Sequence, residues 1–197
     1  MMTENAGNII GLSLFGLLIV SLLLDAFCAT TWNKSYFTSG LMVYIKHIPV
    51  NYWHSNLPDT SLFEKVFHSE IVASLTFKEI DVFSYGFREK MAQFRLVRYS
   101  PIMHGLITFD TVNGQVTVTG YANWYALVFS FLWLGMLTVF SVGSWSYGNI
   151  GFSLLIFIGA FAFFSLVMGI LYWIQSSRFS KVAQFAAQTW ARKYMRE

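Results

Sequence analysis

Residues 105–142 read GLITFDTVNGQVTVTGYANWYALVFSFLWLGMLTVFSV, and this stretch decides the fold. Apolar and polar residues alternate on both sides of Asn113-Gly114, which predicts two antiparallel strands joined by a two-residue type I′ turn. From Tyr121 to Val142 no residue is charged, and the run is long enough to cross a hydrocarbon core of about 30 Å. The sequence therefore predicts a β-sheet that is held against a membrane surface.

A first apolar run precedes this region. Residues 9–28 contain no charged side chain except Asp25, and their length also matches a membrane span. A cleaved secretory signal, the alternative, has a positively charged start, whereas residues 1–8 contain no Lys or Arg. We therefore expect an uncleaved first transmembrane helix, with Asp25 as an interfacial anchor at its end rather than a proton relay.

A third apolar run, residues 150–174, is separated from the second by a short polar turn at residues 143–149. So short a turn predicts a hairpin of two transmembrane helices. Tryptophan and tyrosine side chains, which prefer the headgroup region, stand at the ends of these two runs. They are Trp124, Tyr125, Trp145, Tyr147, Tyr172 and Trp173. The sequence thus predicts three spans, at residues 9–28, 121–142 and 150–174.

The C-terminal tail, residues 175–197, carries five Lys or Arg against one Asp or Glu. Because cations near span ends stay in the cytoplasm, we expect the tail and the domain of residues 29–120 to be cytoplasmic and residues 1–8 to be outside. Apolar residues recur at helical spacing in the tail, which predicts a basic amphipathic helix on the membrane surface. The residues expected at that interface are Arg178, Lys181, Trp190, Arg192 and Lys193.

The region between the first and second spans is long enough for a small domain. Residues 29–120 contain four short segments rich in β-branched and aromatic residues, the composition of strands. These segments are residues 36–50, 75–83, 93–99 and 105–120. Residues 58–74 have helical spacing, with Ser61 and Glu64 at the spacing of a capping box. We expect an α+β domain of about four to five strands and one helix.

Composition supports the membrane prediction and excludes several functions. Charged residues make up 12% of the chain and hydrophobic residues 55%, whereas soluble domains usually have about a quarter of their residues charged. Residues 29–121 hold eight Lys or Arg against seven Asp or Glu, which is not the basic surface that nucleic-acid binding requires. Cys28 is the single cysteine, so no disulfide can form within the chain.

The sequence contains no clear cofactor or metal signature. Its histidines are not paired at the spacing of metal ligands, and no catalytic motif accompanies them. They are His47, His54, His68 and His104. A metal-dependent enzyme would need distant residues such as His68, Glu70 and His104 to converge, which we keep as an alternative.

A basic cluster is the strongest candidate for a binding surface. It consists of Arg88, Lys90, Arg95 and Arg98, interleaved with aromatic residues. If these cations face the bilayer, we expect them to bind anionic lipid headgroups or an acidic partner. The alternative is a solvated loop whose cations pair with nearby carboxylates. Gly7 and Gly11 have the spacing of a small-residue contact between transmembrane helices.

These features predict a non-enzymatic accessory or scaffold subunit of a larger membrane complex, in the plasma membrane or the inner membrane of a bacterium. Three spans are few for a transport path, and a domain tethered at both ends cannot reach far for soluble substrates. Two alternatives remain: a membrane-anchored sensor or regulator that binds a lipid or small ligand in the α+β domain, and the metal-dependent enzyme. We expect the lipid bilayer and other membrane subunits as partners, with no cofactor and no nucleic acid.

Overall fold

The computed structural model describes residues 2–51, 57–68, 74–89, 102–145 and 150–192. The chain divides into two compact units, each built from two separate parts of the sequence. The helical unit comprises Met1–Asp25 and Trp124–Leu171, and the α+β unit comprises Ala26–Asn123 and Tyr172–Glu197. The predicted α+β class is confirmed, because the second unit contains a five-stranded antiparallel sheet.

The helical unit is formed by most of helix α1 (Met2–Thr30), by helix α4 (Trp124–Trp145) and by the first part of helix α5 (Ile150–Arg192). Helices α1 and α5 are long and apolar enough to cross a membrane. The apolar stretch of α4, Trp124–Val139, is shorter, so this criterion does not establish the span predicted at residues 121–142. A signal sequence near the N-terminus has the same properties as α1, which makes the criterion weak by itself.

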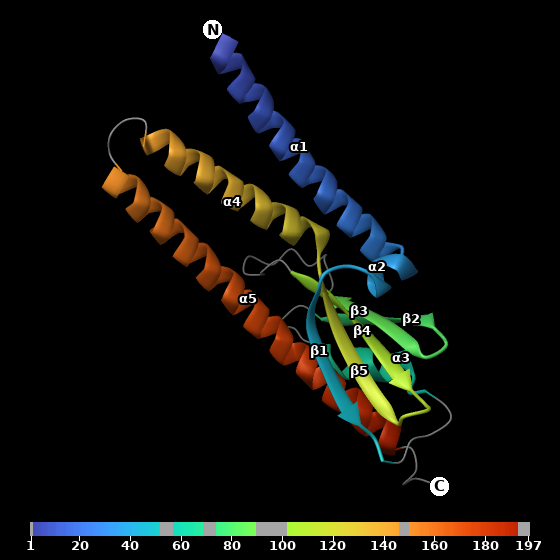
Figure 1. Cartoon of the computed structure of the whole chain (residues 1–197). Helices are drawn as coiled ribbons and strands as arrows, with labels where there is room; N and C mark the ends of the chain where they lie inside the picture. The colour runs from blue at the N-terminus through green and yellow to red at the C-terminus, as the bar shows by residue number, and fades with distance from the viewer. Residues whose placement is uncertain (1, 52–56, 69–73, 90–101, 146–149, 193–197) are drawn as a thin grey trace. The chain divides into compact units, whose positions relative to one another are not determined.

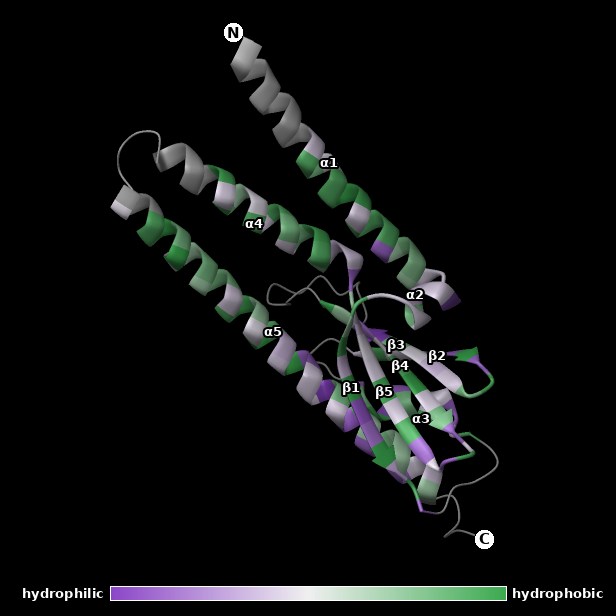
Figure 2. Ribbon diagram, viewed as in Figure 1, coloured by the Kyte–Doolittle hydropathy of each residue, from purple (hydrophilic) through white to green (hydrophobic). Residues whose placement is uncertain are grey.

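Large apolar side chains are exposed along the three helices of this unit. Examples are Leu23, Phe131, Val139, Leu155, Phe163 and Leu166. Figure 2 shows that apolar residues predominate in the coloured parts of α1, of α4 and of the first part of α5. Between α4 and α5 the rings of Phe129, Trp133 and Phe164 pack together, with centroids 6.0 to 6.3 Å apart. The remaining apolar surface needs an apolar environment, such as lipid or another helix.

The sheet contains strands β1 (Met42–Pro49), β2 (Leu75–Asp81), β3 (Ser84–Glu89), β4 (Met103–Asp110) and β5 (Gln115–Ala122). Their order is β1-β5-β4-β3-β2, with every neighbouring pair antiparallel (Figure 1). The pairs β2–β3 and β4–β5 are hairpins, whereas β1 crosses over to pair with β5. Strands therefore occur in three of the four predicted segments, whereas β3 lies in none of them. The segment at residues 93–99 lies outside the described residues.

The β4–β5 hairpin closes with a longer loop than the predicted two-residue turn. Asp110 pairs with Gln115, which leaves residues 111–114 in the loop. The Asp110 carboxylate accepts two backbone N–H groups of the loop, including that of Asn113 at 3.0 Å, and Gly114 has a left-handed φ of 60°. The hydrogen bonds from the backbone and side chain of Asn113 lower the pKa of Asp110. These bonds stabilise the four-residue loop.

Helix α3 (Thr60–Val66) and the C-terminal half of α5 cover one face of the sheet. The α5 residues buried in this core are Phe179, Val182, Ala183, Ala186, Ala187 and Trp190. The sequence predicted this apolar helix face on the membrane surface, in a separate helix of residues 175–197. Instead, α5 is one helix from Ile150 to Arg192, and the apolar face of its C-terminal half packs on the sheet.

Two glycines make room for aromatic rings in this core. Gly105 and Gly120 pair directly across β4 and β5. A Cβ atom on Gly105 would lie 2.1 Å from the ring of Phe87, and one on Gly120 would lie 2.9 Å from the ring of Phe179. The missing side chains therefore let β3 and α5 place their rings directly against the backbone of the sheet.

The opposite face of the sheet is partly covered by helix α2 (Lys34–Thr38). Phe37 of this helix is fully buried and belongs to the same cluster as Leu106 of β4. The sequence predicted a strand from residue 36 onward. Asn33 explains the difference, because its side chain accepts the backbone N–H of Ser35 at 3.0 Å and caps a short helix.

Helix α3 is shorter than the helix predicted for residues 58–74. Asp59 caps its N-terminus by accepting the backbone N–H of Ser61 at 3.1 Å. Glu64 was expected to complete a capping box with Ser61, but its side chain accepts a backbone N–H of β2 at 3.2 Å. The helix is therefore capped by a different residue, and Glu64 ties it to the edge strand of the sheet.

Candidate functional site

The chain passes between the α+β unit and the helical unit at three points, residues 25/26, 123/124 and 171/172. Within the α+β unit, the residues beside these points gather at the start of β4. We call this group the exit cluster. It consists of Ala29, Ile102, Met103, His104, Asn123 and Gln175. The cluster is where all three connections to apolar helices meet the sheet.

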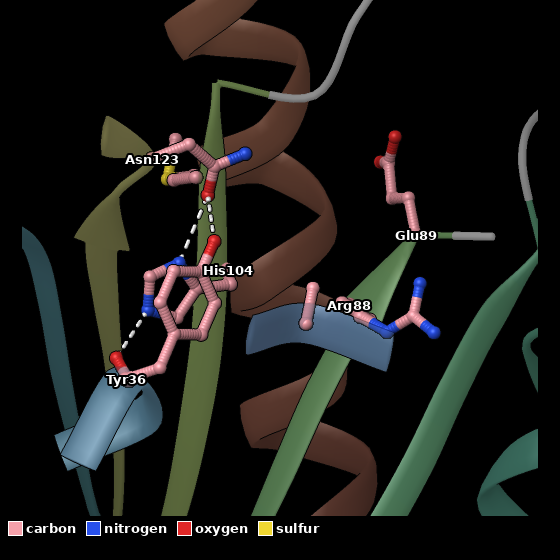
Figure 3. A pocket seen from close by; sticks show the side chains of 7 residues that line it. Tyr36, Arg88, Glu89, His104 and Asn123 are labelled. Atoms are coloured by element: carbon pink, nitrogen blue, oxygen red, sulfur yellow. Dashed lines mark hydrogen bonds between the residues drawn. The ribbon is translucent and has the colours of Figure 1, made fainter. Parts of the chain in front are cut away.

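His104 is the centre of the exit cluster, and only 2% of its surface is exposed. Its Nε2 atom donates to the carbonyl oxygen of Tyr36 at 2.9 Å, and its Nδ1 atom is hydrogen-bonded to Oδ1 of Asn123 at 2.9 Å (Figure 3). The hydroxyl of Tyr36 donates to the same Oδ1 atom at 3.4 Å, and the two rings stack with centroids 4.0 Å apart. The imidazole therefore joins α2, β4 and the residue that precedes α4.

Two amide residues of the cluster complete the hydrogen bonding of the chain at the start of β4. The side-chain oxygen of Gln175, which is fully buried, accepts the backbone N–H groups of Ile102 and Met103, both at 3.1 Å. The backbone N–H of Asn123 donates to the carbonyl oxygen of Ile102 at 2.8 Å. Without these partners, buried backbone groups would lack hydrogen bonds, which is costly. The cluster thus fixes α5 and the end of β5 to one point.

A small pocket lies beside His104. Its lining residues are Ala29, Tyr36, Arg88, Glu89, Met103, His104 and Asn123 (Figure 3). The cavity measures about 10 Å³, which is close to the minimum that holds one water molecule. Sites for small organic ligands occupy about 300 Å³ or more. This pocket therefore does not favour the hypothesis of a small-ligand sensor.

Arg88 is a half-buried cation at the edge of this pocket. Its guanidinium carbon lies 5.2 Å from the ring centroid of Trp32, which is a cation–π contact. Burial lowers the pKa of Arg88. Its Nε atom is buried, and among the residues that the structure describes it has no hydrogen-bond partner. The guanidinium is thus partly desolvated, and no carboxylate of the described residues pairs with it.

The neighbouring residue, Glu89, is a buried charge that does have an ion-pair partner. Only 2% of its surface is exposed, and its Oε1 atom forms an ion pair with Arg178 of α5. The side chain of Arg178 is itself largely buried. This pair joins β3 to α5 inside the α+β unit, so Arg178 neutralises a buried carboxylate.

Asp25 belongs to the helical unit and has a structural role there. Its carboxylate oxygens accept the backbone N–H groups of Trp124 at 3.1 Å and Tyr125 at 2.6 Å. These are the first residues of α4, whose initial N–H groups have no partner within the helix. Only 1% of the Asp25 surface is exposed. The prediction of an interfacial anchor is therefore refined to an N-terminal cap supplied by a different helix.

Of the four residues of the predicted basic cluster, the structure describes only Arg88. Lys90, Arg95 and Arg98 lie outside the described residues. Of the predicted membrane-interface residues, Arg178 is paired with Glu89 and Trp190 is buried in the sheet core. Their apolar and charged partners come from the sheet, which sequence periodicity does not identify.

The other predicted residues have these positions. Lys181 is exposed on α5. Arg192 ends α5, but its side chain lies outside the described part of the chain, as does Lys193. Gly7 and Gly11 fall within α1, and their surroundings are likewise not described.

The hypothetical metal site does not assemble from the described residues. His104 is buried in its hydrogen-bond network, His68 is exposed, and Glu70 lies outside the described residues. In the described part of the chain, no three His, Cys, Asp or Glu residues are close enough to hold a metal ion. The metal-dependent enzyme remains a hypothesis without a site in these regions.

The sequence did not identify Asn123 and Gln175 as important residues. The available signal was their position, since each is a polar amide directly beside an apolar run. Such residues often satisfy backbone groups where a chain enters or leaves a helix. Compared with known protein families, with curated proteins and with solved structures, the chain matches none.

Proposed function

We propose that the chain is an integral membrane protein with three spans that serves as a non-enzymatic accessory or scaffold subunit of a larger membrane complex. The observation that carries this proposal is the exit cluster. All three connections to apolar helices leave the α+β unit at one end of its sheet. This is the arrangement that a domain resting on a membrane surface requires, because every span must enter the same leaflet.

The way the α+β unit is built supports an even number of crossings between its two parts. Tyr172–Glu197 and Ala26–Asn123 belong to one compact unit, so both lie on the same side of a membrane. The residues between them must then cross an even number of times. Helix α5 is long and apolar enough to cross once, and the 22 residues of α4 extend about 33 Å, enough for the second crossing. This parity supports α4 as a membrane span, in addition to α1 and α5.

Aromatic residues at the connections support the same placement. Trp124 begins α4, and both Trp173 and Tyr172 follow the apolar part of α5 with exposed rings. The Tyr172 hydroxyl donates to the carbonyl oxygen of Val43 on β1 at 3.3 Å. Amphipathic rings prefer the headgroup level, so these positions suit a domain that rests there. Five Lys or Arg in residues 175–197 favour a cytoplasmic domain and an external N-terminus.

Open glycines on the apolar helices support a role in a complex. At Gly16, Gly135, Gly159 and Gly169 an added Cβ atom would meet no atom within 4 Å. Small residues on a span let a neighbouring helix approach closely. In a protein that acts through its spans, we expect these positions to contact helices of other subunits.

Topology can be tested with single cysteines in a Cys28→Ser background. A cysteine replacing Val112, which is highly exposed in the β4–β5 loop, should react with a membrane-impermeant maleimide only in inverted vesicles. A cysteine replacing Ser144, near the end of α4, should react only in intact cells. Labelling of both from the same side would contradict the two crossings, and labelling of the Val112 variant in intact cells would contradict the orientation.

The role in a complex requires a separate measurement. Chemical crosslinking in membranes followed by purification in mild detergent should recover the chain with other integral membrane proteins. Gly159→Leu should weaken this association, whereas Leu155→Ile, on the same exposed part of α5, should not. A chain that stays monomeric in both membranes and detergent would contradict the accessory role.

A further inference from the structure

In the described part of the chain, Arg88 is a half-buried cation that has no carboxylate partner. Among the described residues, Lys34 pairs with Asp81 at 2.5 Å and Arg178 pairs with Glu89, but Arg88 pairs with neither acid. Its guanidinium lies against the Trp32 ring, and its buried Nε atom has no described acceptor. A partly buried cation without an anion is unfavourable unless an anion from outside the chain completes the site.

The position of Arg88 indicates where that anion comes from. Arg88 lines the same pocket as Ala29 and Asn123, which stand beside two of the three exits from the α+β unit. Trp32 follows the end of α1 by only two residues. Under the proposed function, on which this inference rests, these exits mark the membrane surface, where lipid phosphates lie.

We propose that Arg88 and Trp32 bind the phosphate group of an anionic phospholipid. The guanidinium presents a planar set of N–H donors that matches two phosphate oxygens, which an ammonium group cannot reproduce. The indole ring holds the guanidinium plane on one side and itself prefers the headgroup level. The lipid charge compensates the cation that the fold leaves partly desolvated.

The test compares the lipids that the purified full-length protein retains. The protein is reconstituted in nanodiscs of phosphatidylglycerol and phosphatidylcholine in equal amounts, and bound lipids are counted by native mass spectrometry. Wild type should retain phosphatidylglycerol preferentially. Arg88→Gln should reduce that preference roughly fivefold, the factor that corresponds to about 1 kcal/mol for one basic residue near an anionic surface.

Three further variants separate the site from general charge and from misfolding. Lys65→Gln removes an exposed cation in the last turn of α3 and should leave the preference unchanged. Arg88→Lys keeps the charge without the planar donors and should have an intermediate preference. Trp32→Leu keeps Arg88 but removes the ring and should weaken the preference. Thermal unfolding of each variant identifies any that fail to fold. The variants that do fold then decide whether Arg88 and Trp32 set the lipid preference.

Several outcomes would overturn the lipid site. Equal retention of both lipids by wild type, or an unchanged preference in Arg88→Gln, would do so while the cysteine labelling still supports the three spans. Equal losses in Arg88→Gln and Lys65→Gln would reduce the effect to general charge. If inorganic phosphate displaces the lipid from wild type when chloride at equal ionic strength does not, the site binds free phosphate and the lipid assignment fails.

Discussion

Glu89 and Arg178 bring opposite charges together inside the α+β unit, where water cannot easily solvate either. A buried ion pair adds little stability over an apolar pair of the same shape, but removing one partner leaves a buried charge uncompensated. We therefore expect the pair to contribute mainly to specificity, because the two charges meet in only one register of α5 against β3. This role depends on the two charged side chains and not on the rest of α5.

Replacing Arg178 should destabilise the α+β unit more than replacing a neighbouring cation. We expect Arg178→Gln to lower the free energy of unfolding by about 3 kcal/mol, because Glu89 keeps its charge without its partner. Denaturant unfolding of the protein in detergent measures this change. Lys181→Gln, an exposed cation of the same helix, is the control and should change stability by less than about 0.5 kcal/mol. Equal effects of the two variants would contradict the role of the ion pair.

Sequence reasoning predicted the kind of residue at several positions but not its partner. Arg178 is a cation beside an apolar run, and the sequence therefore predicted that it lies at the membrane surface. Its partner is 89 positions away in the chain, and nothing local indicates that pairing. His104 is similar, since its hydrogen-bond partners come from Tyr36 and Asn123. Side chains whose roles depend on long-range contacts are the ones that sequence patterns miss.

Helix α4 depends on an N-terminal cap that is supplied by another helix, α1. Asp25 of α1 accepts the first two N–H groups of α4. We expect Asp25→Ala to lower the free energy of unfolding by about 1 to 2 kcal/mol, because those N–H groups lose their acceptors. Circular dichroism during thermal unfolding in detergent measures the change.

Asn is the matched replacement at this position. Asp25→Asn keeps one carbonyl oxygen that can accept an N–H group, so it should recover part of the loss. Exposed Ser and Thr positions elsewhere on α1, such as Thr30, should tolerate Ala with little effect. If Asp25→Ala and Asp25→Asn both unfold like wild type, the carboxylate does not stabilise α4.

The elements that sequence predicted well are those with strong local patterns. The β4–β5 hairpin has clear alternation, and its strands were confirmed, although Asp110 gives it a four-residue loop. Helix α2 was missed because its five residues are too few for periodicity, and its signal was only the cap at Asn33. The predicted division into two helices at residues 150–174 and 175–197 was wrong. The composition changes from apolar to amphipathic there, but such a change does not require a break in the helix.

The core of the α+β unit is completed by residues from the C-terminal end of the chain. Deleting residues 172–197 should leave the strands without the α5 side chains that complete their core. We expect this variant to lose amide protection throughout β4 and β5, measured by hydrogen exchange in detergent. Full protection in the deletion variant would contradict the role of α5 in the core.

A milder pair of variants tests the same dependence. Trp190→Ala should lower stability by about 3 to 5 kcal/mol, because this fully buried ring packs on Phe109 with centroids 5.3 Å apart. Trp173→Ala removes an equal ring that is 71% exposed and should have a much smaller effect on unfolding. A larger loss for Trp173→Ala would contradict the division of α5 into an exposed and a core segment.

The division into two interleaved units was beyond prediction from the sequence. The sequence placed the domain at residues 29–120 and the tail outside it, because contiguous segments are the simplest partition. The structure assigns Tyr172–Glu197 to the domain instead. The sheet has too much apolar surface for α2 and α3 alone to cover, so a further helix is needed, but its origin depends on three-dimensional packing.

This late contribution of α5 determines the order in which the protein is completed during translation. The ribosome makes all five strands before it makes Phe179 or Trp190. The part of the sheet face that α5 covers therefore stays exposed while α4 and the first half of α5 are synthesised, and chaperones can bind it. A ribosome that stalls before residue 179 would release a polypeptide that contains β1 to β5 but lacks the α5 side chains of their core, and proteases of cellular quality control would recognise its exposed apolar residues.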